Sequence, residues 1–143
     1  MNIELRVKNL IRKHKTNCPF QIASLLNINV WFLDLGENCR GYYLKTLRRR
    51  YIAINSKLSD EWQRFVCAHE LGHDRLHSGM MGYYFIEQHT LFNPGKFERQ
   101  ANSFAVKLLL SCEMPECDEG LDYFLLRNGV PLEMSKYVER DSC

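Results

Sequence analysis

The chain has 143 residues, of which 45% are hydrophobic and 25% are charged. This size and composition are typical of one globular domain, which we expect to span residues 1–143, and they exclude a disordered chain. The net charge of +2 is too small to indicate nucleic acid binding. No run is long enough to span a membrane and the N-terminus lacks a signal-peptide core, so we expect a cytoplasmic protein with free thiols.

Hydrophobic periodicity predicts two helices at the start of the chain. Apolar residues at helical spacing predict the first helix over residues 2–14. Pro19 stands at a first-turn position of a second helix that continues to Leu26. Residues 21–28 are superficially like the first half of a helix-turn-helix. The apolar run at 30–33 is typical of a strand and not of a recognition helix, so we expect no direct contact with nucleic acid.

Three short segments rich in strand formers follow, at residues 30–35, 41–45 and 50–55. Their short connections predict an antiparallel meander. Lys45 and residues 48–50 form a basic cluster beside the third strand. This cluster could attract an acidic stretch of a partner, although we favour an ordinary solvated turn.

The next helix contains the motif H-E-x-x-H. Ser59 is a good N-cap, and acidic residues fill the first turn. Positions i and i+4 share one helix face about 6 Å apart along the axis, so His69 and His73 can hold one Zn²⁺ ion. Glu70 then stands beside the ion, where it can take a proton from water. The alternative interpretation is a surface helix with two ordinary histidines. Gly72 disfavours a helix and so predicts a close approach of another backbone or a ligand.

A catalytic zinc site commonly has a third protein ligand. The predicted helix at 96–111 carries Glu98 in its first turn and Asn102 one turn later on the same face. We prefer Glu98 as the ligand, although a solvated first-turn acid is an equal alternative. Asn102 could accept the N–H of a liganding imidazole and fix its tautomer. His77 is too far along its helix to be a ligand, because eight residues rise about 12 Å, so we expect a supporting or core histidine there. Weaker alternatives for the third ligand are Glu87, His89 and Asp74.

The remaining segments are less informative. Residues 78–95 form a long irregular stretch, which is usually functional or mobile. Residues 114–115 should stop the preceding helix, and two short helices are expected at about 119–128 and 131–140. A donor that stabilises the transition state is also expected. Its candidates in the long irregular stretch are Tyr83, Tyr84 and His89. Together these elements predict an α+β fold, with a small three-stranded antiparallel sheet packed on helices and the H-E-x-x-H helix at its core.

Two motifs in this order resemble one known family. Residues 52–59, 63–73 and 76–77 resemble the first signature of the ImmA/IrrE metallo-endopeptidases, and residues 98–109 resemble the second. The resemblance covers most of the chain. It implies a gluzincin-like (zincin-like) fold with one Zn²⁺ ion.

The resemblance also assigns roles to particular residues. It implies His69, His73 and Glu98 as the metal ligands, and Glu70 as the general base. Family members of phages and mobile elements cleave or inactivate a partner repressor that has a helix-turn-helix domain. The resemblance therefore implies that such a repressor is the partner, in the cytoplasm of a bacterial host.

We therefore expect a zinc-dependent endopeptidase, although another divalent ion could occupy the site in the cell. The strand before the metal helix is a natural edge for an extended substrate to pair with, although an ordinary sheet edge is an equal alternative. Its residues are Tyr51, Ile52, Ala53, Ile54 and Asn55. The alternative function is a non-catalytic, metal-stabilised regulator that acts by binding its partner. Retention of Glu70 argues mildly against this alternative, because a structural metal site needs no base.

Overall fold

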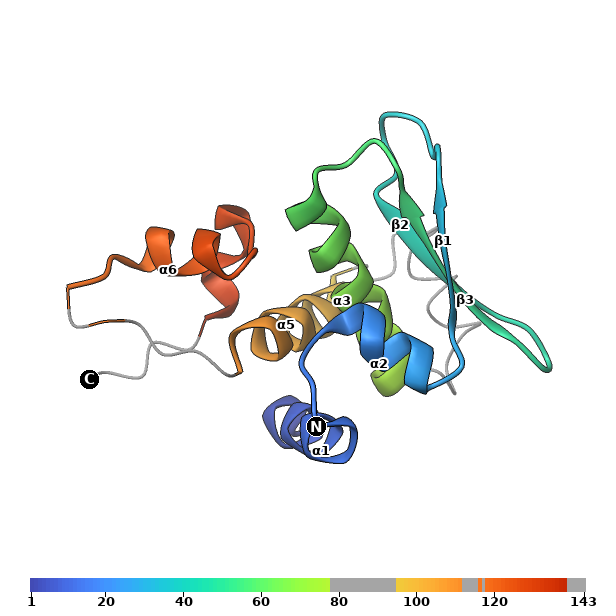
Figure 1. Ribbon diagram of the computed structural model, residues 1–143, viewed down its shortest axis with the longest axis horizontal. Coiled ribbons are helices and arrows are strands. Elements are labelled where there is room, and N and C mark those ends of the chain that lie inside the picture. The colour runs from blue at the N-terminus through green and yellow to red at the C-terminus, as the bar shows by residue number, and fades with distance from the viewer. Residues whose placement is uncertain (78–94, 112–115, 117, 139–143) are drawn as a thin grey trace.

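The computed structural model describes residues 1–77, 95–111, 116 and 118–138 (Figure 1). Its elements in chain order are α1 (Ile3–His14), α2 (Pro19–Leu25), β1 (Asn29–Leu33), β2 (Gly41–Lys45), β3 (Arg50–Asn55), α3 (Asp60–His77), α5 (Lys96–Leu110), α6 (Leu121–Arg127) and the 3₁₀ helix η2 (Leu132–Tyr137). Helix α3 lies between the sheet and α5, and α6 lies at the opposite end of the molecule from the sheet. The H-E-x-x-H helix is therefore central, as the sequence predicts.

The sheet confirms the α+β class but not the predicted meander. Its strand order is β1-β3-β2, with β3 parallel to β1 and antiparallel to β2. The prediction of an entirely antiparallel sheet is therefore wrong. The physical reason lies in burial, because β3 is buried from Ile52 to Asn55 whereas β1 and β2 are mostly exposed. The strand with the most buried side chains takes the central position, and its two neighbours form the edges.

Asn55 stabilises the connection that this strand order requires. The segment between β1 and β2 must pass the end of β3, and Asn55 lies there with only 4% of its surface exposed. Its Nδ2 atom donates to the carbonyl oxygens of Gly36 and Cys39, each at 2.8 Å. Its backbone N–H donates to Arg40 O at 2.9 Å. One buried amide thus binds the connecting loop that carries the chain across the sheet.

Helix α3 starts as the sequence predicts. Trp62 N–H donates to Ser59 Oγ at 3.4 Å, which caps the first turn. The helix is largely buried from Phe65 to His77. Its buried polar side chains are Glu70, His73, Asp74 and His77. Residues 29–33 form a strand after α2, as expected, and not a recognition helix. No helix in the described ranges is both long and apolar enough to cross a bilayer.

Several predicted boundaries differ from the structure. β1 ends at Leu33, two residues early, because the Asp34 carboxylate accepts the N–H of Gly36 at 3.0 Å and starts a turn. The last element is a 3₁₀ helix that ends at Tyr137, before the predicted end. The long irregular stretch at 78–94 and the helix stop at 114–115 lie outside the described residues.

Candidate metal centre

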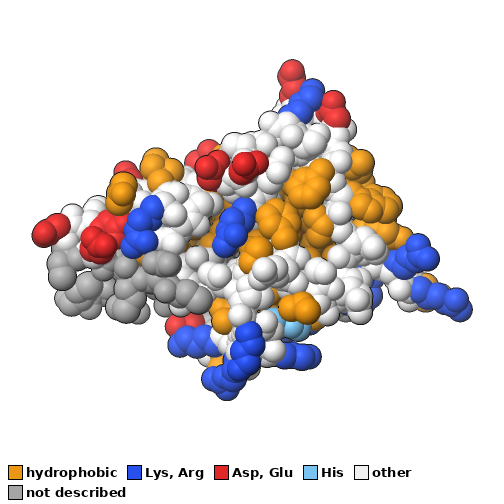
Figure 2. All heavy atoms as spheres, in the orientation of Figure 1, with side chains coloured by type: hydrophobic (Ala, Val, Ile, Leu, Met, Phe, Trp, Pro, Cys, Tyr) orange, Lys and Arg blue, Asp and Glu red, His pale blue; other side chains and the backbone are white. Residues whose placement is uncertain are grey.

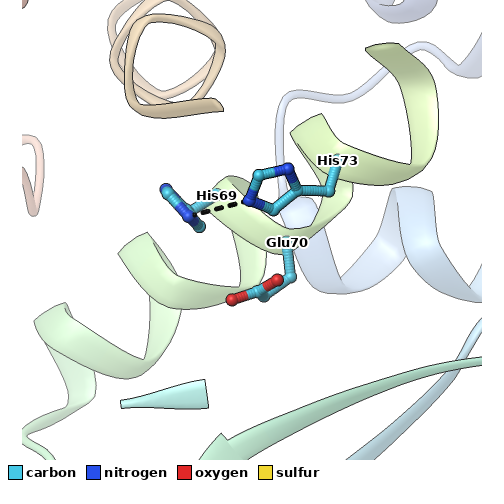
Figure 3. Close-up of side chains that lie close together, drawn as sticks. All are labelled: His69, Glu70 and His73. Carbon is cyan, nitrogen blue, oxygen red and sulfur yellow. Dashed lines mark hydrogen bonds between the residues drawn. The ribbon is translucent and has the colours of Figure 1, made fainter. Parts of the chain in front are cut away.

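His69 and His73 lie one turn apart on α3 and point to the same side of it (Figure 3). Their Nε2 atoms are 3.2 Å apart. Close contact between α3 and α5 brings the third group near. At Gly72 of α3, an added Cβ atom would lie only 3.1–3.2 Å from atoms of the Phe104 side chain on α5. The close approach at Gly72 is therefore made by the Phe104 side chain, and not by a backbone or a ligand as the sequence predicts.

Glu98 projects from the first turn of α5 onto the two imidazoles. Its Oε2 atom lies 3.0 Å from His69 Nε2, and its Oε1 atom lies 3.2 Å from His73 Nε2. In a tetrahedral zinc site with bonds of about 2.1 Å, neighbouring ligand atoms are about 3.4 Å apart. The two nitrogens and the carboxylate thus have nearly the spacing that three ligands of one ion require. A Glu70 oxygen lies within 4.8 Å of both histidines' ligating atoms.

Hydrogen bonds on the far side of each ring favour the tautomer that a metal ligand needs. His69 Nδ1 lies 2.7 Å from Asn102 Oδ1, an acceptor, so its proton resides on Nδ1. His77 Nε2 donates to Gln100 Oε1 at 2.7 Å, which leaves His77 Nδ1 as an acceptor. His73 Nδ1, 2.9 Å away, donates to that atom. Both Nε2 atoms therefore carry lone pairs toward Glu98.

This arrangement fits a cation. Three electron-pair donors face one another at 3.0–3.2 Å, and without a positive charge between them they repel. Two buried carboxylate atoms, Glu70 Oε2 and Glu98 Oε1, accept no hydrogen bond from a described residue. Because buried polar atoms are almost always satisfied, these two support an ion or water at this point. The donor set of two imidazoles and a carboxylate is one that zinc binds in catalytic sites.

The electrostatics of the site separate its titratable groups. Burial lowers the pKa of His73 to about 4, so this imidazole is neutral at pH 7. Burial also lowers the pKa of His69, but Glu98 and Glu70 outweigh it and raise the net value. Burial opposes ionisation of Glu98, yet hydrogen bonds from the two imidazoles, when these carry a proton on Nε2, hold its pKa well below the usual range. Burial raises the pKa of Glu70 to about 7, which is suited to a group that takes up and releases a proton.

A cleft of about 190 Å³ opens over this cluster. It is lined by Arg40, Gly41, Trp62, Phe65, Val66, His69, Glu70, Glu98, Asn102 and Met134. A larger hollow of about 770 Å³, between α2 and β1, contains none of the clustered histidines or glutamates. The smaller cleft therefore carries the chemistry. Arg40, whose guanidinium lies 4.0 Å from the centre of the Trp62 ring, was not expected there from the sequence.

The expected substrate edge is wrong. The strand Tyr51, Ile52, Ala53, Ile54 and Asn55 belongs to β3, whose backbone pairs with a strand on each side. It has no free edge to offer. β2 pairs with β3 on one side only among the described residues, and its first residue, Gly41, lines the cleft. A Cβ atom at Gly41 would lie 2.6 Å from both Ala53 O and Val66 Cγ1, so only glycine fits. This glycine was the available signal for the strand that meets the cleft.

The structure places the other candidates among the described residues outside the group of three candidate ligands. Asp74 is not at the cluster, because its buried carboxylate accepts hydrogen bonds from Tyr43, Arg50 and Arg75. His77 supports His73 from behind, as an accessory imidazole. Tyr137 was not foreseen, and its hydroxyl accepts a hydrogen bond from Asn102 Nδ2 at 3.2 Å. Glu87, His89, Tyr83 and Tyr84 lie outside the described residues.

An H-E-x-x-H helix with such a cluster is typical of the metal-dependent peptidases. Residues 23–134 match the family model described as the IrrE N-terminal-like domain, Peptidase M78. The chain therefore belongs to this family of peptidases, which act on proteins and hold a metal ion.

Two proteins are similar to this chain, and one of them is named as a metallopeptidase. The chain is 40% identical over 137 residues to "Uncharacterized immunity region protein 2" of Bacillus phage phi105, covering 93% of this chain and 86% of that protein. It is 33% identical over 122 residues to "Metallopeptidase ImmA" of Bacillus subtilis (strain 168), covering 85% and 69% respectively. No solved structure matches the chain.

Proposed function

We propose that this protein is a zinc-dependent endopeptidase that cleaves a helix-turn-helix repressor and so regulates a prophage or mobile element. One observation carries the catalytic part. His69 Nε2, His73 Nε2 and the Glu98 carboxylate converge at 3.0–3.2 Å, with the Glu70 carboxylate beside them. His69, His73 and Glu98 would hold the ion. A bound divalent ion would supply Lewis-acid activation of a water molecule and of the scissile carbonyl group.

Glu70 is the general base in this proposal. Its side chain is 3% exposed, and its Oε2 atom has no hydrogen-bond donor among the described residues. This free lone pair can take a proton from the attacking water. With a pKa raised to about 7 by burial, the same carboxyl group can then deliver the proton to the leaving amine. A site with only a structural role would not require an unpaired buried carboxylate at this position.

The substrate backbone would bind along β2. Only one side of this strand is paired with another described strand, and it begins at the cleft, so an extended peptide can add to its other side by main-chain hydrogen bonds. Gly41 keeps this end of the strand close to β3 and α3, because no side chain separates them. Asn102 fixes the orientation of His69 while the substrate is bound.

The biological part of the proposal rests on similarity. A phage immunity-region protein and a metallopeptidase of a bacterium are both similar to this chain, so we place it in phage immunity within the bacterial cytoplasm. A repressor is the protein whose removal would end immunity, and it is the expected substrate. The cleft over the cluster is too small for a folded domain, so the substrate would enter as an extended segment.

The test compares wild-type protein with Glu70→Gln, both loaded with Zn²⁺ and incubated with the repressor encoded beside the gene. The wild type should cut the repressor, whereas the variant should bind the same amount of zinc and lose cleavage by on the order of 10²–10⁴-fold. Undiminished cleavage by the variant would remove Glu70 as base. Relief of repression by both proteins without any cleavage would instead support a non-catalytic regulator.

A further inference from the structure

The hairpin that joins β2 and β3 carries a cluster of exposed basic side chains at its tip. Residues 38–59 contain no aspartate or glutamate. Lys45, Arg48 and Arg49 are exposed, and none forms an ion pair with a residue in the described part of the chain. Leu47, between them, is 98% exposed. Lys and Arg side chains accordingly stand out at the right-hand end of Figure 2, where Figure 1 shows the hairpin.

Arg50 is not part of this tip, although the sequence groups it there. Its guanidinium contacts both Asp74 carboxylate oxygens at 3.1 Å and the Leu26 carbonyl. Tyr43, on the neighbouring strand, donates to the same carboxylate at 2.6 Å. These contacts, of which the Tyr43–Asp74 hydrogen bond is buried, hold this part of the hairpin to α3. At the other end, Thr46 N–H donates to Arg49 O at 2.8 Å and closes the turn. The tip is therefore presented on a fixed support.

The opposite end of β2 lies at the catalytic cleft. Gly41 lines that cleft, and the strand runs from it to Lys45 at the hairpin. Four residue steps in an antiparallel strand span about 14 Å. A peptide paired along the side of β2 that no described strand occupies would therefore pass from the cleft to the basic tip. Residues roughly four to eight positions from the cleaved bond would reach the three cations.

We propose that the tip formed by Lys45, Arg48 and Arg49 is a docking site for acidic residues of the protein substrate. This inference rests on the proposed peptidase function and adds a requirement about the substrate. An acidic polypeptide fits better than nucleic acid for two reasons. The tip continues the strand that leads from the cleft, and the net charge of the whole chain is only +2. Opposite charges would raise the encounter rate and fix the register of the substrate.

Cut sites in a mixture of many peptides test this proposal directly, and the natural substrate need not be identified first. The zinc-loaded protein is incubated with the long peptides that chemical cleavage at methionine gives from a bacterial proteome, and new termini are identified by mass spectrometry. Glu70→Gln protein defines the background. Sites cut by the wild type should be enriched in Asp and Glu roughly four to eight residues from the bond on one side.

Matched variants then locate the preference. Changing Lys45, Arg48 and Arg49 to Gln should abolish the enrichment. It should also lower kcat/KM on a selected acidic peptide by on the order of tenfold at low salt, and less at high salt. The control changes three exposed basic residues of α1 to Gln, and so removes the same charge elsewhere. These residues are Lys8, Arg12 and Lys13, and their variant should keep the enrichment.

The outcomes separate the two proposals. If the wild type cuts no more than Glu70→Gln, the peptidase function and the docking site are both overturned. If it cuts without an acidic preference, or if the tip variant keeps that preference, only the docking site is overturned. Tip-dependent binding to short duplex DNA, measured by anisotropy and without an acidic preference in cleavage, would also overturn it. Equal zinc content in both triple variants excludes a folding defect as the cause.

Discussion

Replacing Asn102 with Leu should weaken zinc binding by a factor that the structure allows us to bound. Asn102 Oδ1 accepts the His69 Nδ1 proton at 2.7 Å and so directs the Nε2 lone pair toward Glu98. Leu has a similar volume but no acceptor. Loss of such an outer hydrogen bond typically costs 10–100-fold in metal affinity, or about 1.4–2.7 kcal/mol. At saturating zinc, the stabilisation given by the metal should fall by the same amount. For a chain of this size, that lowers the melting temperature by roughly 4–8 °C.

The assay is competition for Zn²⁺ against a chromogenic chelator, with melting curves recorded with and without zinc. The metal-free curves measure any direct effect of the substitution on folding. The difference between the melting temperatures with and without zinc therefore gives the stabilisation by the metal. Tyr137→Phe is the matched control, because it removes the other partner of Asn102 and leaves the acceptor for His69. A zinc affinity of Asn102→Leu within about threefold of wild type would refute the reasoning, since a lost outer bond should cost at least tenfold.

Tyr43→Phe should lower the free energy of unfolding in urea by about 1.5–3 kcal/mol, because the buried Tyr43 hydroxyl donates to the Asp74 carboxylate at 2.6 Å. Tyr42 is exposed on the same strand, so Tyr42→Phe should change this free energy little, and equal losses in the two variants would contradict the prediction. Burial raises the pKa of the Cys67 thiol, so an alkylating reagent should modify Cys67 far more slowly than the partly exposed Cys18 and Cys39. The modified residues are identified by peptide mapping of the native protein, and equal rates would show that the helix opens. Zinc affinity should fall about tenfold per pH unit below the pKa of His69, because protons then compete with the metal for Nε2. This loss should begin above the ordinary value of 6.5, because the pKa of His69 is raised in the metal-free protein. Affinity that stays constant down to pH 5 would exclude His69 as a ligand.

The sequence predicts the cluster well because local geometry determines most of it. The spacing of His69 and His73 needs only one helix, and Ser59 indicates where that helix begins. Glu98 requires a contact between two helices, which periodicity alone does not specify. Its position follows from a rigid helix with an acid in the first turn and from the resemblance to a family. The structure places it where both arguments expect it.

The strand order could not be predicted in the same way. Short connections favour neighbouring strands, but the connection between β1 and β2 passes the end of β3 instead. The interaction that permits this is the burial of a single amide, Asn55, whose bonds reach residues far along the chain. The assignment of the substrate edge failed for the same reason. The role of Gln100 could not be predicted either, because it depends on which nitrogen of His77 carries the proton. His77 itself is the supporting, buried histidine that the sequence predicts.

The most direct test of the metal centre is X-ray absorption at the zinc edge on the loaded protein, with zinc content measured on the same sample. One ion per chain should be found, with two imidazoles and a carboxylate oxygen at about 2.0–2.2 Å. In Glu98→Ala, the carboxylate oxygen should be missing from the shell and the affinity should fall sharply. An unchanged spectrum and affinity in Glu98→Ala would contradict the account, because the ion would then lie somewhere other than between these three side chains.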